Sequence, residues 1–338
     1  MDQDSSLRDT KRVFSGIQPT GDFHLGNLLG AVDNWVPLQD THDAYYCVVD
    51  LHAATVPWDP AALRREVLSM TALLIACGLD PERSILFVQS HVPYHSELCW
   101  ILTCIARMGE LRRMVQFKEK SKGESESVGV GLLTYPALQA ADVLLYRAHG
   151  VPIGEDQRQH IELMRTLAGR FNQTFGPAFV VPEPWIREEG ARIRALDNPD
   201  EKMSKSTPRP ASKILLTDSP TIIAKKIRSA VTDSGREVRA AGDKPAITNL
   251  LTIFSLVTKT PIPELEERYE GTGYAAFKVA LADAVVDALA PIQKRYEELV
   301  SDRGEIERTL ADGASRAEAE AGATMADVRA KTGLGPPA

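Results

Sequence analysis

Cysteine is scarce in this chain of 338 residues, which contains four of them: Cys47, Cys77, Cys99 and Cys104. So few thiols in so long a chain do not form the disulfide framework of a small secreted protein, and we expect reduced thiols packed in the core. Cys99 and Cys104 are close in sequence, but no second close pair of cysteines accompanies them, so core packing is a better interpretation than a metal site. The sequence therefore predicts no metal site built by the protein alone.

Long apolar runs are also absent. No stretch of about 18 uninterrupted apolar residues occurs, and a membrane-spanning helix is not expected. Residues 1–6, Met-Asp-Gln-Asp-Ser-Ser, have neither the basic start nor the apolar run of a secretory signal peptide. Together with the expected reduced thiols, these absences predict a cytoplasmic protein.

Positive charge is in deficit, because 39 Lys and Arg against 46 Asp and Glu give a net charge of −7. An acidic chain is a poor non-specific ligand for nucleic acid, so contact with RNA requires a local basic face. Charge alone favours a solvated helix face for each of the two basic clusters in the sequence. These clusters are Arg107, Arg112, Arg113, Lys118, Lys120 and Lys122, and then Lys225, Lys226 and Arg228.

The pattern of apolar residues predicts two regions, as expected for this length at about 100–200 residues per domain. Short β-branched or aromatic runs at 13–17, 44–49 and 85–88 are typical of buried parallel strands. One helical pattern spans 27–39, and another, between the second and third strands, ends at Gly78. Strands that alternate with helices predict an α/β fold with a parallel sheet.

The strand pattern fades beyond about residue 220. Segments 247–258, 275–300 and 303–330 have helical periodicity and predict a C-terminal helical bundle. Surface loops are expected at 121–131, which is rich in Ser, Gly and Glu, and at 197–211, which contains three prolines.

The first motif with chemical content is Ser15-Gly-Ile-Gln-Pro-Thr-Gly-Asp-Phe-His-Leu-Gly-Asn27, which follows the first strand and enters a helix. Its glycines let the backbone approach a ligand, and the free N–H groups of a helix start attract phosphate. It matches neither the dinucleotide fingerprint nor the Walker-A loop, so by itself it is equally a simple turn.

The second motif is Lys202-Met203-Ser204-Lys205-Ser206, in the proline-rich loop. Two lysines three residues apart can place both ammonium groups on one polyphosphate and neutralise charge that grows on departing pyrophosphate. Alone, this motif is equally a solvated loop.

Together, His24-Leu-Gly-Asn27 and Lys202-Met-Ser-Lys-Ser206 resemble the two signatures of class I aminoacyl-tRNA synthetases. Further blocks in the same order resemble the bacterial tryptophanyl-tRNA synthetase family, and the similarity extends over about residues 12 to 335, nearly the whole chain. These blocks are residues 14–19, 116–121, 131–142, 154–163, 190–193 and 229–234.

The resemblance implies an enzyme that joins L-tryptophan to ATP, giving tryptophanyl-AMP and pyrophosphate, and then transfers tryptophan to tRNA(Trp). It implies a Rossmann-like catalytic domain over 1–210, with a helical insertion, and a helical anticodon-binding domain over 211–338, whose last helix can pack back on the first domain. Mg²⁺ accompanies ATP and is held mostly by phosphate and water. The run from Arg107 to Lys122 is expected to receive the acceptor end of tRNA, and family members are homodimers in which one tRNA spans both subunits.

The resemblance also implies the nucleotide site. The first motif and the 154–156 segment line ATP and its ribose, Ile193 and Met203 approach adenine, and the lysines of the second motif reach the β- and γ-phosphates. His24 is a candidate donor to phosphate in the transition state. The nucleotide-site residues implied are Gln18, Pro19, Thr20, His24, Gly26, Asn27, Lys120, Gly154, Glu155, Asp156, Ile193, Lys202, Met203, Ser204, Lys205 and Ser206.

Asp142 is the residue implied to set amino-acid specificity. The indole N–H only donates, so a carboxylate in an apolar pocket accepts it, and a ligand without that donor leaves the acceptor unpaired. In isolation Asp142 is more simply a helix cap or a surface acid. The resemblance implies that the other residues around tryptophan are Tyr135 and Gln157 near its ammonium, the apolar Phe14, Val151 and Ile153, and Gln139 and His52.

Three alternatives for the function remain open from the sequence. Gln139 in Tyr135-Pro-x-x-Gln139-x-x-Asp142 resembles a tyrosyl-tRNA synthetase pattern, although the 154–163 block resembles the tryptophan enzymes. The polar Gln139 is also compatible with an auxiliary copy of the enzyme whose response to tryptophan analogues is altered, and His52 is nearly as well explained as a buried structural histidine. A second class of function is a non-catalytic paralogue that binds tryptophan or a partner, against which both intact signatures argue.

Overall fold

The computed structural model describes residues 10–20, 22–115, 129–186, 193–205 and 207–335. Its five strands form one sheet of order β3-β2-β1-β4-β5, and all neighbouring strands are parallel. The bounds of the strands are β1 Arg12–Ile17, β2 Asp43–Val48, β3 Ile85–Val88, β4 Gly150–Ile153 and β5 Glu183–Ile186. The α/β fold expected from the sequence is confirmed.

Alternate residues of the central strands enter two separate cores, one on each face of the sheet. Val13 of β1 and Tyr46 of β2 belong to one core, whereas their neighbours Phe14 and Tyr45 belong to the other. A sheet that is buried on both faces needs apolar side chains at consecutive positions, which explains why these strands are recognisable as short apolar runs.

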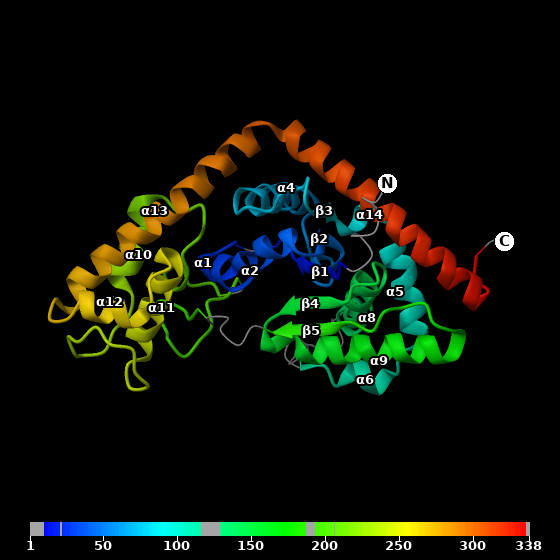
Figure 1. The fold of residues 1–338 in the computed structure, drawn as a ribbon, viewed down its shortest axis with the longest axis horizontal. Coiled ribbons are helices and arrows are strands. Elements are labelled where there is room, and N and C mark those ends of the chain that lie inside the picture. The colour runs from blue at the N-terminus through cyan, green and yellow to red at the C-terminus, as the bar shows by residue number, and fades with distance from the viewer. Residues whose placement is uncertain (1–9, 21, 116–128, 187–192, 206, 336–338) are drawn as a thin grey trace, which may run out of the picture.

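Helices cover both faces of the sheet (Figure 1). Apolar residues of α4 enter the first core, and those of α5, α8 and α9 enter the second. The bounds of the helices in this part of the chain are α1 Leu25–Asn27, α2 Asp33–Trp35, α3 Asp50–Ala53, α4 Pro60–Ala76, α5 Tyr94–Ile105, α6 Met108–Arg112, α8 Gly131–Leu144 and α9 Arg158–Phe175. The expected helix over 27–39 is in fact four short segments, in which α1 and α2 flank a π-helical stretch, Leu28–Val32, and are followed by a 3-10 stretch, Val36–Asp40. Pro37 lacks an N–H and does not continue regular α-helical bonding there.

The C-terminal third is helical, as the periodicity predicted. It contains α10 Pro220–Ser229, α11 Pro245–Thr258, α12 Ile262–Arg268, α13 Gly273–Ser301 and α14 Arg303–Thr332. Asp302 separates the last two, and its side chain caps α14 by accepting a hydrogen bond from the backbone N–H of Glu305. α14 runs at an angle to α13 (Figure 1). No helix of the described segments is long and apolar enough to cross a membrane.

The last helix, α14, returns to the sheet (Figure 1). Its apolar residues join both cores, and Gly313 lies against β3, where a Cβ atom would be 1.9 Å from the carbonyl oxygen of Leu86. Arg329 near its end bonds Glu97 of α5, with Nε 2.7 Å from Oε1. The chain therefore leaves the sheet after β5, forms the helical region and comes back to cover β3.

Candidate active site

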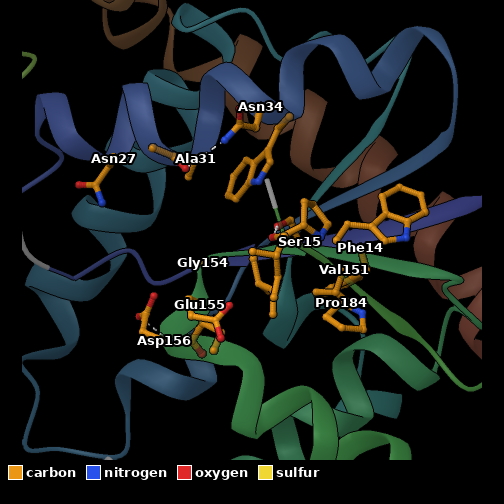
Figure 2. Close-up of a pocket in the computed structure, with 18 of the residues that line it drawn as sticks. Phe14, Ser15, Asn27, Ala31, Asn34, Val151, Gly154, Glu155, Asp156 and Pro184 are labelled. Carbon is orange, nitrogen blue, oxygen red and sulfur yellow. Dashed lines mark hydrogen bonds between the residues drawn. The ribbon is translucent and has the colours of Figure 1, made fainter. Parts of the chain in front are cut away.

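A cavity of about 1950 Å³ opens at the carboxyl ends of β1 and β4. These neighbours are the strands at which the order of the sheet reverses, the usual position of a ligand crevice in an open parallel sheet. In Figure 2, Asn27, Ala31 and Asn34 lie on one side of the cavity and Gly154, Glu155 and Asp156 on the other.

Backbone hydrogen bonds bring the two sequence motifs together. His24 forms an antiparallel bridge with Leu215, and the N–H of Leu25 donates to the carbonyl oxygen of Ile214 at 2.8 Å. The 193–203 segment folds back on itself, and the N–H of Met203 donates to the carbonyl of Ile193 at 3.0 Å. As a result, a Cβ atom on Gly26 would lie 3.5 Å from the Cβ of Met203, although the two residues are 177 positions apart, from 26 to 203.

The lysines of the second motif both contact segments of the cavity wall. Lys202 Nζ lies 3.8 Å from Asp156 Oδ1. Lys205 Nζ donates to the carbonyl oxygen of Gln18 at 2.9 Å and to that of Thr20 at 3.5 Å. Burial lowers the pKa of Lys205 to about 8, so its ammonium is still mostly charged at neutral pH. Lys202 therefore lines the cavity, and Lys205 is bonded to the backbone of the first motif.

His24 is buried beside this space. Burial, followed by the positive charges of nearby lysines, lowers the pKa of His24 to about 3, so the imidazole is neutral at neutral pH. Its Nδ1 atom has no hydrogen-bond partner among the described residues. A buried polar atom without a partner is costly, and a polar ligand atom at this position would remove that cost.

Asp142 is buried in α8 and is held by three donors. Its Oδ1 accepts from Gln89 Nε2 at 2.6 Å and from His95 Nδ1 at 2.7 Å, and its Oδ2 accepts from His52 Nε2 at 2.8 Å. Burial alone would raise the pKa of Asp142, but the contacts from His52 and His95 outweigh it and lower that pKa to about 2. The carboxylate is thus ionised, and since each of its oxygens has two lone pairs, one lone pair of Oδ2 stays available.

A second buried pair lies near Asp142. Tyr135 Oη is 2.8 Å from His160 Nε2, and burial lowers the pKa of His160 to about 4. The ring of His52 meets that of Tyr135 edge-on, with 6.4 Å between the ring centroids. Asp142, His52 and Tyr135 all line the cavity, so an acceptor and aromatic surface face the same space.

The structure brings most of the expected site residues to this one cavity. Pro19, Thr20 and Lys205 do not line it, and Lys205 reaches the first motif through its backbone carbonyls instead. Lys120 and Ser206 lie outside the described residues. The expected residues that line the cavity are Phe14, Gln18, His24, Gly26, Asn27, His52, Tyr135, Gln139, Asp142, Val151, Ile153, Gly154, Glu155, Asp156, Gln157, Ile193, Lys202, Met203 and Ser204.

Sequence reasoning missed several residues at the site. Gln89 and His95 contact Asp142, and Trp35 and Trp185 line the cavity. The position of Gln89, directly after the apolar strand 85–88, was a usable signal, because the carboxyl ends of parallel strands meet at one edge of the sheet. Nothing in the local sequence marks His95.

Comparison with known proteins agrees with the resemblance. Residues 7–290 match the family model for class I tRNA synthetases (W and Y). The chain is 54% identical to a tryptophan–tRNA ligase of Caldanaerobacter subterraneus, covering 96% of this chain and 98% of the relative. Among solved structures it is similar to the tryptophanyl-tRNA synthetase of Mycoplasma pneumoniae (37% identity, TM-score 0.88, 96% and 98% of the two chains).

It is also similar to the tryptophanyl-tRNA synthetase of Campylobacter jejuni in complex with ADP and tryptophan (34% identity, TM-score 0.83, 96% of this chain and 100% of that chain). The match to the family model covers more than half of the chain, and the similarity to the Caldanaerobacter relative spans nearly all of both proteins. The chain therefore belongs to the class I tRNA synthetases of the tryptophan and tyrosine family.

Proposed function

We propose that this protein is a tryptophan–tRNA ligase that uses ATP to activate L-tryptophan and transfers it to tRNA(Trp). The observation that carries the proposal is the single cavity lined by both an ionised, buried Asp142 and the two signature segments with Lys202 and His24. The identity of the chain to tryptophan–tRNA ligases along nearly their whole length supports it.

The first step joins the two small substrates. A carboxylate oxygen of tryptophan attacks the α-phosphorus of ATP, the bond from that phosphorus to the bridging oxygen breaks, and pyrophosphate leaves with the electron pair. In the second step a ribose hydroxyl at the 3′ end of tRNA attacks the carbonyl carbon and gives up its proton to water. The bond from that carbon to the phosphate oxygen breaks, and AMP leaves with the electron pair. Neither step needs a covalent enzyme intermediate, so the protein acts by positioning reactants and stabilising charge.

The tryptophan end of the cavity recognises the indole N–H. Gln89, His95 and His52 occupy three of the four lone pairs of the Asp142 carboxylate, and the fourth accepts the ring N–H of the substrate. A phenylalanine or leucine side chain would leave this acceptor unpaired, which is the basis of strong discrimination. Tyr135 and Gln157 are assigned to the substrate ammonium, with Phe14, Val151, Ile153 and Gln139 around the ring.

The nucleotide end holds ATP between the two motifs. Gln18, Gly26 and Asn27 line the nucleotide and its phosphates, with Gly154, Glu155 and Asp156 at the ribose and Ile193 and Met203 at adenine. Pro19 and Thr20 belong to the same motif but do not line the cavity. Lys202 and Lys205 neutralise the charge that develops on pyrophosphate. Neutral His24 retains one ring N–H with which to contact phosphate. Ser204 lines the cavity, whereas the roles of Ser206 and Lys120 rest on the sequence alone.

Mg²⁺ enters with ATP. The described residues contain no group of three His, Cys, Asp or Glu side chains placed to hold a metal ion. We therefore assign the ion to the phosphates and water, where it supplies charge neutralisation, and the protein contributes the lysines around it.

The protein is further assigned as a cytoplasmic homodimer that binds tRNA across both subunits. Trp100 on α5 is 69% exposed and Met108 on α6 is 55% exposed, and this exposure is among the highest of the large apolar side chains in the described residues. Burying them against a second copy would explain it. Light scattering tests this assignment, and a monomer that charges tRNA at full rate would contradict it.

The decisive experiment is ATP–pyrophosphate exchange with tryptophan and tyrosine assayed side by side. Exchange that depends on tryptophan is expected, followed by formation of tryptophanyl-tRNA when tRNA(Trp) is added. Exchange driven by tyrosine would identify a tyrosine-specific relative. Tryptophan binding without exchange would favour a non-catalytic paralogue.

A further inference from the structure

Lys213 places a buried ammonium group between the two motifs of the nucleotide site. Its side chain is 6% exposed, and its Nζ meets three acceptors: the carbonyl oxygens of Lys205 at 2.9 Å and Thr207 at 3.2 Å, and Asp22 Oδ2 at 3.0 Å. An ammonium has three N–H donors, so each donor has an acceptor. A buried lysine is costly without such partners, and here the local fold satisfies it fully.

The main chain beside Lys213 is anchored to the first motif. Directly after it, the carbonyl of Ile214 accepts the N–H of Leu25 at 2.8 Å, and the N–H of Leu216 donates to the carbonyl of Phe23 at 3.1 Å. Lys213 therefore extends from a backbone that is bonded to the start of α1. The side chain of Lys213 therefore connects the carbonyl oxygens of Lys205 and Thr207 to that backbone.

Lys205 is thereby held at two points. Its carbonyl oxygen accepts from Lys213, and its own ammonium reaches the carbonyl of Gln18 in the first motif. Asp22, which also belongs to the first motif, balances the charge of Lys213 and completes the connection. A shift of about 1 Å in a group that acts on the reacting phosphates can lower a rate by about a hundredfold.

We propose that Lys213 is a positioning residue for the activation step. Its ammonium holds the backbone at residues 205 and 207 against Asp22, so that Lys205 meets the leaving pyrophosphate. The inference rests on the proposed function, since it concerns the same nucleotide site. Lys213 acts through Lys205 and does not itself contact the substrate.

The test replaces Lys213 by methionine, which keeps the length of the side chain and removes its charge. In tryptophan-dependent ATP–pyrophosphate exchange, Lys213→Met is expected to lower kcat by about tenfold to a hundredfold, while the Kd for tryptophan changes less than twofold. A matched control is Lys278→Met, because Lys278 is also a buried lysine that donates to two backbone carbonyls, those of Arg228 and Ala230, and it joins α13 to the end of α10. The control is expected to keep the parental exchange rate.

A double-mutant cycle with Lys205→Ala separates positioning from general support of the fold. If Lys213 acts through Lys205, adding Lys213→Met to Lys205→Ala lowers kcat by less than about threefold more. The inference would be overturned if the losses in kcat of the two single variants multiplied in the double variant, or if Lys213→Met alone kept the parental kcat.

A second variant covers the case in which Lys213→Met does not fold. Asp22→Asn removes the charge partner from a half-exposed position and is expected to lower kcat by about threefold to tenfold, again without a further loss in the Lys205→Ala background. Unchanged kinetics in Asp22→Asn would count against the connection. If the parent protein itself shows no tryptophan-dependent exchange, the proposed function fails. If the parent is active but the losses in kcat of the two substitutions multiply in the double variant, only the inference about Lys213 fails.

Discussion

The ammonium of Lys205 donates to the backbone carbonyl oxygen of Gln18 at 2.9 Å, so the second motif lies closed on the first. This contact joins residues 187 positions apart and places a cation on the backbone of the first motif. Since a backbone carbonyl is a weaker partner than a phosphate oxygen, the contact is easily exchanged when a polyphosphate enters. The pair therefore holds the lysine close to the proposed phosphate site.

Replacing Lys205 by alanine is expected to slow the reaction far more than it weakens substrate binding. We expect kcat for exchange to fall by about a hundredfold or more, because the contact tightens as pyrophosphate leaves. The Kd for tryptophan, measured by calorimetry, is expected to change less than twofold. Lys259→Ala, which removes a 74% exposed lysine paired with Asp33, is the control and should behave as the parent. Equal losses in binding and turnover would contradict the role of Lys205.

Replacing Asp142 by asparagine tests recognition of the indole N–H. An amide keeps the shape, but its NH₂ group faces the donors of Gln89, His95 or His52, so the acceptor for the substrate is lost. We expect KM for tryptophan to rise by about a hundredfold, with a small change in KM for ATP. Asp218→Asn, at a buried acid that pairs with Lys226, is the control. A rise in KM of less than about threefold would exclude Asp142 as the specificity residue.

The sequence alone predicted those strands and helices whose buried residues follow a clear pattern along the chain. β1, β2 and β3 are apolar runs, and the long C-terminal helices have clear periodicity. β4 and β5 were missed, since each is four residues long and contains a proline, Pro152 and Pro184, which weakens a strand pattern. Their positions in the sheet come from the pairing of β4 with β1 and of β5 with β4, contacts that the local sequence does not encode.

The residues of the site could likewise be predicted only in part. The resemblance supplied the residues of the two motifs, but the contacts that hold them depend on distant segments. His95 reaches Asp142 across 47 positions, and Lys213 reaches Asp22 only because the 214–216 segment pairs with the start of α1. A lysine just after a proline-rich loop is ordinarily solvated, so neither the burial of Lys213 nor its three acceptors could be inferred from the sequence.

Acid is expected to destabilise the protein from about pH 6.5 downward. Burial lowers the pKa of His24 to about 3 and that of His160 to about 4, so below pH 6.5 the unfolded chain binds protons that the folded chain does not, and the free energy of unfolding falls. Each histidine accounts for a loss of about 2 kcal/mol between pH 7.5 and pH 5. Asp142 adds a further loss below about pH 4, because its pKa is lowered to about 2 and the stability it contributes disappears as the pH falls through that value.

Urea denaturation at pH 7.5 and at pH 5 measures this effect. In His24→Gln, the difference in the free energy of unfolding between pH 7.5 and pH 5 is expected to be about half of that in the parent, since the glutamine does not titrate. A difference that is the same in the variant and in the parent would show that His24 is already protonated in the folded state at pH 5.

Docking of α14 on the sheet depends on a glycine. A Cβ at Gly313 would lie 1.9 Å from the carbonyl oxygen of Leu86, a backbone atom that cannot move without disturbing β3. Gly313→Ala is therefore expected to lower the free energy of unfolding by about 3 kcal/mol or more, despite the better helix propensity of alanine. Gly322→Ala on the same helix is the matched control, because its Cβ would meet Tyr94 at an ordinary distance of 3.5 Å. Thermal melting should show a marked fall in Tm for the first variant and a parental or higher Tm for the second, whereas equal Tm values would mean that α14 does not lie this close to β3 in solution.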